Sequence, residues 1–348
     1  MRVTALLIGF GNVSQGFVSV LTNRRSYLRE ALGIDLSIVG VVEGARRDGK
    51  HYSAFCSEGL DLKTMLRTKR QEGTISAYPN VGGHDSPLDL IGKSRAQLMV
   101  EATPTNLRNG EPALAYMKAA LGLGMHVVSA NKGPFVFALR QLKDLAKRNK
   151  VELKYSAAVA GALPIIPTGD YALIGANVTS IEGILNGTTN YILTQMAEKG
   201  VEMKEALLDA QRKGIAETDP RLDISGEDTA VKLLIAANSI MQSDTQISDI
   251  RISGIEHITH DDILSAKKRG HTLRLIGTAR SVSGSVAMKV EVQEVGADHP
   301  FFWVNGTSKA VILDTDIMGR IALIGGESNP QLAAGAMLRD TLNSFRRS

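Results

Sequence analysis

Short apolar runs alternate with longer amphipathic segments over the first 155 residues of the chain. The runs have the length of buried strands and lie at 3–8, 36–42, 97–101, 126–129 and 151–155. The segments between them repeat apolar positions at helical spacing and lie at 13–32, 60–70, 111–121 and 135–147. Strands that alternate with helices predict a parallel sheet with helices on both faces. We therefore predict an α/β, doubly wound domain over residues 1–155.

The pattern changes after Gly161. Strand-like segments with more alternation follow at 181–185 and 285–295, and helical segments follow at 191–199, 203–213 and 229–241. This mixture predicts a second, α+β domain over residues 156–319. An Ala-rich helix is predicted at 331–343. We expect this C-terminal helix, within about 320–348, to pack back on the first domain.

The composition of the 348 residues (37.3 kDa) is that of an ordinary globular protein with room for two domains. Its charges sum to only +4 and are scattered, so they give no concentrated nucleic-acid footprint, and an anionic small ligand is compatible with them but not required. The single Cys56 excludes an intrachain disulfide and fits a reducing, cytoplasmic location. No apolar run approaches the roughly 18–20 residues of a membrane span. The short apolar N-terminus is better explained as a buried strand than as a signal peptide.

The turn after the first predicted strand has the sequence G9-F10-G11-N12-V13-S14. In a Rossmann-like dinucleotide fold, the first Gly permits the tight turn and the second lets a pyrophosphate approach the helix N-terminus. Ser14 replaces the third Gly of that pattern. Because the turn lies between the first strand and the first helix, we predict that residues 9–13 (Gly9, Phe10, Gly11, Asn12 and Val13) bind a dinucleotide.

The end of the second strand carries conflicting signals about which dinucleotide binds. Glu43 stands where a carboxylate accepts the ribose hydroxyls of NAD. Arg46 and Arg47 follow at once, with Lys50 close behind, and these cations favour the 2′-phosphate of NADP. The residues alone leave NAD and NADP as alternatives.

Polar residues also follow the next two strands of the first domain. Thr103 lies in one of these loops and Lys132 in the other, where doubly wound folds place their ligands. We predict Lys132 as a site residue, against the alternative of a solvated loop lysine. The later segment 186–190 (N-G-T-T-N) is equally compatible with a simple helix cap and with a set of donors for a polar substrate.

Carboxylates are concentrated between Ala210 and Lys232, just before and within a predicted helix. Asp228 and Lys232 are four residues apart, so they share one face of that helix. The flanking residues are nearly all apolar or small, which predicts a helix buried on most sides. Buried charges are costly unless they are paired or functional, so this pair is a candidate catalytic group.

The segment 210–232 matches, at every fixed position, the signature A-x3-G-hydrophobic-small-x2-D-P-x2-D-aliphatic-x-G-x-D-x3-K. By this signature the chain resembles the homoserine dehydrogenase family. Three further segments are similar to that family: N-G-T-T-N-Y at 186–191, A-V-A-G-A-L-P at 158–164 and H-P-F-F-W-V-N-G at 299–306. The resemblance runs from Gly9 to about Gly319. It implies a short, monofunctional member without a kinase-like extension or a C-terminal regulatory domain.

The resemblance implies the NAD(P)-dependent interconversion of L-homoserine and L-aspartate 4-semialdehyde, on the route to threonine and methionine. It implies that Lys232 gives a proton to the aldehyde oxygen, with Asp228 beside it. Lys132 would contact nicotinamide and substrate, while Glu217 and Asp223 would bind the substrate. The family's Gly-rich, cofactor-facing turn falls on Gly326. We further expect a homodimer formed through the second domain, with the reaction in the cleft between the domains.

The family often binds a monovalent cation through a Glu side chain and backbone carbonyls. The resemblance places those carbonyls on Val159, Gly161 and Leu163, but Ser156 stands at the position of the Glu. This departure weakens the expected sodium site. The alternatives for the whole chain are another amino-acid dehydrogenase of similar architecture and a catalytically silent dinucleotide sensor. The intact Lys132 and Lys232 argue against the sensor.

Overall fold

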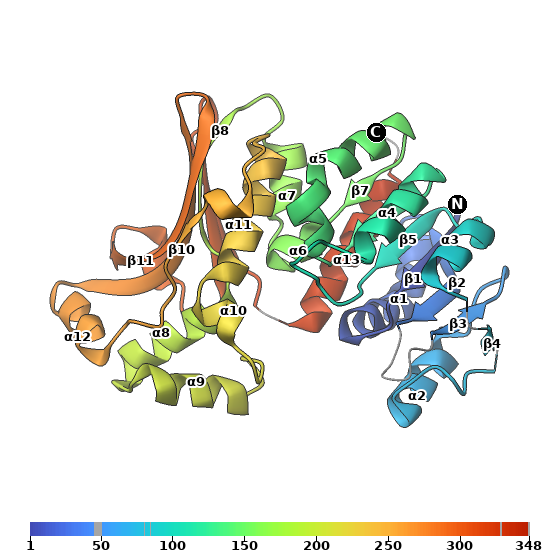
Figure 1. Ribbon diagram of the computed structural model, residues 1–348, viewed down its shortest axis with the longest axis horizontal. Coiled ribbons are helices and arrows are strands. Elements are labelled where there is room, and N and C mark those ends of the chain that lie inside the picture. The colour runs from blue at the N-terminus through green and yellow to red at the C-terminus, as the bar shows by residue number, and fades with distance from the viewer. Residues whose placement is uncertain (45–50, 80, 84, 328, 347–348) are drawn as a thin grey trace. The chain divides into compact units, whose positions relative to one another are not determined.

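The computed structural model describes residues 1–44, 51–79, 81–83, 85–327 and 329–346. It consists of two compact units, drawn in Figure 1, which are described separately here. Unit 1 comprises Met1–Ala158 together with Pro330–Ser348, and unit 2 comprises Val159–Asn329. The polypeptide therefore leaves unit 1, builds all of unit 2 and returns to unit 1.

Unit 1 contains a seven-stranded sheet in the order β4-β3-β2-β1-β5-β6-β7. Its five parallel strands are β1 (Arg2–Ile8), β2 (Asp35–Glu43), β5 (Leu98–Glu101), β6 (His126–Ser129) and β7 (Leu153–Lys154). These are the five predicted strands. The remaining two, β3 (Tyr52–Phe55) and β4 (Val81–Gly83), run antiparallel at one edge. The prediction of an all-parallel sheet was wrong there, because the polar stretch after Glu43 hides two short strands.

Helices cover both faces of this sheet. They are α1 (Asn12–Glu30), α2 (Leu62–Glu72), α3 (Pro87–Ser94), α4 (Ala113–Gly122), α5 (Gly133–Arg148) and α13 (Pro330–Ser344). Alternate residues of β1 point to opposite faces. Leu7 packs in one core with Phe17 of α1 and Met337 of α13. On the other face, Leu6 and Leu90 of α3 both lie close to Gly40 of β2. The predicted doubly wound, Rossmann-like architecture is confirmed.

Unit 2 contains a six-stranded mixed sheet in the order β13-β12-β8-β10-β11-β9. Its strands are β8 (Val178–Ile184), β9 (Arg251–Ile252), β10 (His271–Val282), β11 (Ser285–Gly296), β12 (Lys309–Thr315) and β13 (Arg320–Gly325). Its helices are α6 (Ser156–Ala160, which begins in unit 1), α7 (Ile165–Pro167), α8 (Gly187–Lys199), α9 (Met203–Arg212), α10 (Arg221–Ile224), α11 (Glu227–Ile240) and α12 (His260–Lys268), with short turns at Thr168–Ala172, Ile247–Asp249 and Pro300–Trp303. This confirms the predicted α+β character.

The chain end is divided between the two units. Residues 320–325, which we placed with the C-terminal helix, form strand β13 beside β12 in unit 2. Helix α13 then joins the core of unit 1 through Ala334, Met337 and Leu338. None of the described helices is long and apolar enough to cross a membrane.

Candidate active site

The turn between β1 and α1 has the backbone that a dinucleotide requires. Gly9 has φ +88°, and a Cβ there would lie 2.7 Å from the carbonyl oxygen of Ala102, so only Gly fits. A Cβ on Gly11 would meet no atom within 4 Å. The first helical N–H bond of α1 runs from Gln15 to Gly11, so the N–H groups of residues 12–14 precede the helical bonding and suit an anion. Phe10 is buried in the core below the turn.

Ser14 takes the place of the third Gly at this turn. Its side chain is fully buried, and its Oγ has no hydrogen-bond partner among the described residues. The next residue, Gln15, donates from Nε2 to the carbonyl of Phe10 at 3.4 Å and so ties the helix back to the turn. The turn thus fits a dinucleotide pyrophosphate despite its altered pattern, with Val13 half-buried and Asn12 exposed beside it.

The carboxylate of Glu43 at the end of β2 is already bound within unit 1. One oxygen pairs with the ammonium of Lys69 on α2. The other accepts hydrogen bonds from Thr74 Oγ1 at 2.9 Å and from the backbone N–H of Ile75 at 2.8 Å. The side chain is buried, and Lys69 neutralises its charge. Glu43 therefore serves in a structural ion pair here and is not a free carboxylate that could accept hydrogen bonds from a ribose. Arg46, Arg47 and Lys50 lie outside the described residues.

Glu101, the last residue of β5, organises the two loops that carry Thr103 and Lys132. Its fully buried carboxylate accepts hydrogen bonds from the Thr103 N–H at 2.8 Å, from the Thr103 hydroxyl and from Ser129 Oγ at 2.7 Å. Burial raises the pKa of Glu101, and the hydrogen bonds from Thr103, Ser129 and Asn131 oppose that rise. The ends of β5 and β6 are held together through this one side chain.

Asn131 fixes the backbone on both sides of Lys132. Its Nδ2 donates to the carbonyl of Thr103 at 3.2 Å, and its Oδ1 accepts from the N–H of Gly133 at 3.0 Å. A Cβ on Gly133 would lie 2.5 Å from the carbonyl oxygen of Asn106, so α5 can begin there only with Gly. Lys132 is therefore half-buried at a rigid strand-to-helix junction, as its predicted role requires.

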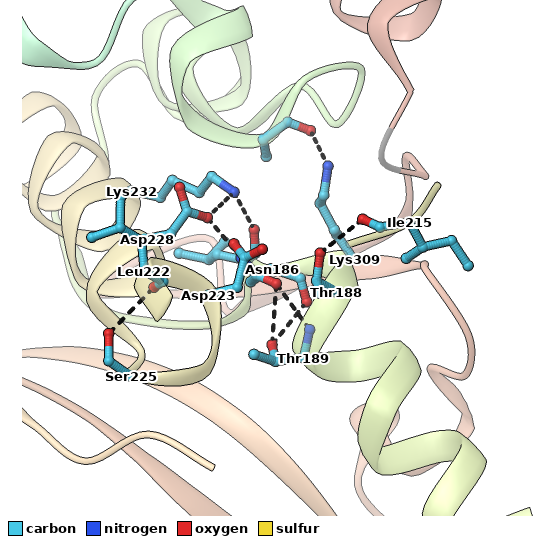
Figure 2. Close-up of polar contacts among 12 residues, drawn as sticks. Asn186, Thr188, Thr189, Ile215, Leu222, Asp223, Ser225, Asp228, Lys232 and Lys309 are labelled. Carbon is cyan, nitrogen blue, oxygen red and sulfur yellow. Dashed lines mark hydrogen bonds and ion pairs between the residues drawn. The ribbon is translucent and has the colours of Figure 1, made fainter. Parts of the chain in front are cut away.

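In unit 2, Asp228 and Lys232 form an ion pair on α11, drawn in Figure 2. The ammonium of Lys232 lies 2.5 Å from Asp228 Oδ2 and donates to the carbonyl of Leu185 at 3.0 Å. Both side chains are at most 14% exposed. Nearly all other residues in the first ten of α11 are buried, so the prediction of a helix buried on most sides is confirmed.

Asn186 joins this ion pair to Asp223 on α10. Its Nδ2 lies 2.8 Å from Asp228 Oδ2 and 2.6 Å from Asp223 Oδ1, while its Oδ1 accepts from the N–H of Thr189 and caps α8. Asn186 thus acts as the predicted helix cap, and the alternative role of this segment as a set of donors for a substrate stays a prediction. Burial and the neighbouring Asp228 raise the pKa of Asp223, against the opposing effect of Asn186 and Lys232.

Glu217 is a predicted substrate residue of unit 2 that lies outside this group. Its side chain is exposed, and among the described residues no hydrogen bond or ion pair links its carboxylate to Asp223 or Asp228. Only its backbone is tied down, by Nε2 of Gln211 at 3.1 Å. An exposed carboxylate on a loop suits a group that meets a ligand, and the role of Glu217 stays a prediction.

The loop after α6 holds the residues predicted for a cation. A Cβ on Gly326 would lie 3.0 Å from the backbone nitrogen of Leu163, so this Gly packs on the loop, and its contact with a cofactor stays a prediction. The carbonyl of Leu163 accepts from the N–H of Ile165 at 2.9 Å. The ammonium of Lys309, from β12, lies 3.5 Å from the carbonyl oxygen of Ala160. Ser156 binds elsewhere, to Asp340 of α13.

Sequence reasoning missed Glu101, Asn131 and Lys309. Glu101 carried a signal, because a charge that ends an otherwise apolar strand has to be satisfied by its surroundings. Asn131 and Lys309 carried none, because Thr103 and Ala160, to which they bond, lie 28 and 149 residues away along the chain.

A Rossmann-like unit with an open glycine turn, followed by a unit with a buried lysine–aspartate pair, defines a two-unit dinucleotide-binding protein. The homoserine dehydrogenase family model matches residues 164–342. The homoserine dehydrogenase of Methanocaldococcus jannaschii is 36% identical over 98% of both chains. The NAD(+)-dependent homoserine dehydrogenase of Pseudomonas canavaninivorans is 34% identical over 97% of this chain and 94% of its own. The crystal structure of a putative homoserine dehydrogenase from Archaeoglobus fulgidus superposes with a TM-score of 0.86, at 31% identity over 98% of both chains. The chain belongs to the homoserine dehydrogenase family.

Proposed function

We propose that this chain is an NAD(P)-dependent oxidoreductase that interconverts L-homoserine and L-aspartate 4-semialdehyde. The observation that carries the proposal is the buried Asp228–Lys232 pair, held in place by the carbonyl of Leu185 and the amide of Asn186. The family membership gives that pair its chemical meaning. Bound NAD(P) supplies or accepts the hydride, and the protein manages the proton and the substrate charges.

Lys232 is the proposed proton donor in the direction of aldehyde reduction. An ammonium has three N–H groups, and two of them point to Asp228 and Leu185. The third is free to donate to the aldehyde oxygen as negative charge develops there. The carboxylate of Asp228 holds the ammonium in this orientation. Lys132, on its rigid junction in unit 1, is proposed to contact substrate and nicotinamide.

Carboxylates are proposed to bind the ammonium group of the amino-acid substrate. Asp223 is next to Asp228 and shares Asn186 with it. A cation placed against two carboxylates favours their ionised form. Substrate binding would therefore oppose the burial that raises the pKa of Asp223. Glu217, exposed on the preceding loop, is proposed as a second ligand of the same ammonium.

The cofactor is proposed to bind along residues 9–13, with Thr103 beside Gly9 at the end of β5. Both NAD and NADP are candidates, because the neutralised Glu43 neither attracts ribose strongly nor repels a 2′-phosphate. Gly326 is proposed to face the cofactor from unit 2.

We also propose that the chain is a cytoplasmic homodimer formed through unit 2. The edge strand β13 supports this, since its Ile324 is 54% exposed and the adjoining turn exposes Ile317 and Met318. Exposed apolar side chains on an edge strand favour association with a second chain. Analytical ultracentrifugation would test it, and a monomer at micromolar concentration would contradict it.

The test of the reaction is a steady-state assay with homoserine and each cofactor, followed through the absorbance of reduced nicotinamide. We expect turnover with homoserine and none with aspartate. Lys232→Ala should lower kcat by about 10²–10⁴-fold, the usual contribution of a positioned proton donor. Its dissociation constant for the cofactor should not change.

The exposed Lys204→Ala on α9 is the matched control and should keep full activity. Turnover with aspartate alone would favour another amino-acid dehydrogenase. Cofactor binding without any turnover would favour a silent sensor. Unchanged turnover in Lys232→Ala would contradict the assigned proton donor.

A further inference from the structure

Lys309 places a positive charge inside the loop that follows α6. It is the first residue of β12 and is only 5% exposed. Its ammonium lies 3.5 Å from the carbonyl oxygen of Ala160, and 3.9 Å from the position of a Cβ on Gly161. Figure 2 shows the side chain reaching from the sheet to this loop. A buried ammonium is costly unless oxygen atoms surround it, so the loop is its counterpart.

The base of Lys309 is firmly held. Asn190 Nδ2 donates to the carbonyls of Val304, Gly306 and Ser308, at 3.1 Å each, and so fixes the segment that leads into β12. On its other side, Lys309 pairs with Gly325 of β13. The ammonium is therefore delivered to one position by a rigid strand, rather than by a flexible surface chain.

The residues that would hold a monovalent metal at this loop do not fit one. Ser156 provides no carboxylate, and its hydroxyl and N–H donate to Asp340, both at 2.8 Å. The carbonyl of Leu163 is already bonded to Ile165. A metal ion coordinated by Gly161 would also lie close to the ammonium of Lys309, and like charges at such distances repel.

We propose that the ammonium of Lys309 is the permanent cation of this loop and replaces a monovalent metal there. A bound metal ion orders a loop by attracting several carbonyl oxygens to one positive charge. The ammonium of a lysine on a neighbouring strand can do the same, and it cannot dissociate because it is part of the chain. The chain then needs neither Na⁺ nor K⁺ to order residues 159–163. The inference is independent of the proposed reaction, because its consequences concern ion binding and unfolding.

The test is thermal unfolding in NaCl, KCl and choline chloride at equal ionic strength. The wild-type chain should melt at the same temperature in all three salts. Lys309→Ala should melt about 5 °C lower in choline chloride. The loss should be the same in NaCl and KCl, because Ser156 and the bonded carbonyl of Leu163 still provide no metal site. Lys309→Met, which fills the space without charge, should melt lower in all three salts. Lys289→Met, at a half-exposed lysine on β11 of the same sheet, is the matched control and should behave as wild type.

A second measurement uses the wild-type chain alone and does not depend on how the variants fold. Titration followed by ²³Na relaxation should reveal no saturable sodium binding. Saturable binding, or a melting temperature that rises specifically with Na⁺ or K⁺, would overturn the proposal. So would a melting temperature of Lys309→Ala or Lys309→Met equal to that of the wild type in choline chloride.

Discussion

At the scale of residues, the candidate site in unit 2 places two carboxylates, Asp223 and Asp228, next to each other. Asp223 and Asp228 share the amide of Asn186, and only Asp228 has an ion pair with Lys232. The negative charge of Asp228 and burial together favour the protonated form of Asp223. The pKa of Asp223 therefore depends on the charge of Asp228, and we expect substrate binding at this site to depend on pH.

The first prediction concerns that pH dependence. Because the pKa of Asp223 is raised, it gains its proton at a higher pH than an ordinary carboxyl group, and substrate binding should weaken as pH falls through that value. Asp228→Asn removes the neighbouring charge, so it should lower the pKa of Asp223. The acid limb of the kcat/KM profile for homoserine should then move to lower pH.

Asp219→Asn provides the control for this profile. Asp219 is exposed and paired with Arg221 at 2.6 Å, and among the described residues no hydrogen bond links it to Asn186. Its replacement should leave the acid limb where it is, although overall activity can differ. An acid limb in Asp228→Asn that stays put or moves to higher pH would refute the coupling between the two carboxylates.

At the scale of elements, helix α2 supplies the positive charge that balances the carboxylate at the end of strand β2. Lys69 neutralises Glu43 and also donates to the carbonyl of Gly73 at 2.8 Å, at the end of its own helix. A free carboxylate at the end of β2 would attract ribose hydroxyls and repel a 2′-phosphate. We therefore predict that the pair between α2 and β2 influences which cofactor the turn accepts.

Lys69→Met should shift the cofactor preference toward NAD. The ratio of kcat/KM for NADP to that for NAD should fall about tenfold, because an uncompensated charge near a phosphate costs roughly 1.4 kcal/mol at an intermediate dielectric. Lys63→Met, an exposed lysine on the same helix, removes the same charge away from Glu43 and should leave the ratio unchanged. Equal ratios in Lys69→Met and the wild type would mean that Glu43 plays no part in cofactor choice.

Elements with a strong period or a specific turn could be predicted from the sequence. Helix α11 and the Gly9–Gly11 turn are of this kind, because residues adjacent along the chain determine them. Strand β10 was missed although it is 12 residues long and forms a tight hairpin with β11, because the buried Arg274 and Thr278 interrupt its apolar run. The state of Glu43 could not be predicted either, because Lys69 and Thr74 lie 26 and 31 residues away. Local patterns reveal elements, whereas ion pairs depend on how distant elements meet.

At the scale of the whole molecule, the last helix completes unit 1. Asp340 of α13 is 1% exposed and accepts hydrogen bonds from the N–H and hydroxyl of Ser156, 184 residues earlier. Burial raises the pKa of Asp340, which the two bonds from Ser156 partly offset. Both donors would remain buried if this carboxylate were removed.

Asp340→Ala should therefore lower the free energy of unfolding by about 2–3 kcal/mol, measured by urea denaturation. Asp316→Ala is the matched control, because Asp316 also accepts two hydrogen bonds from one residue, Asn177, at 2.8 and 2.7 Å, but at an exposed position. Water can replace those bonds, so the loss should be much smaller. Equal losses in the two variants would contradict the importance of burial at Asp340.

The return of α13 also has a consequence for folding during synthesis. Unit 2 is one continuous stretch, Val159–Asn329, and all of it leaves the ribosome before α13 does. Unit 1 begins first, yet its core includes Ala334, Met337 and Leu338 from the last helix. We therefore expect the apolar face that these residues cover to stay exposed until α13 has been synthesised. Unit 1, whose synthesis begins first, can thus complete its core only after all of unit 2 has been synthesised.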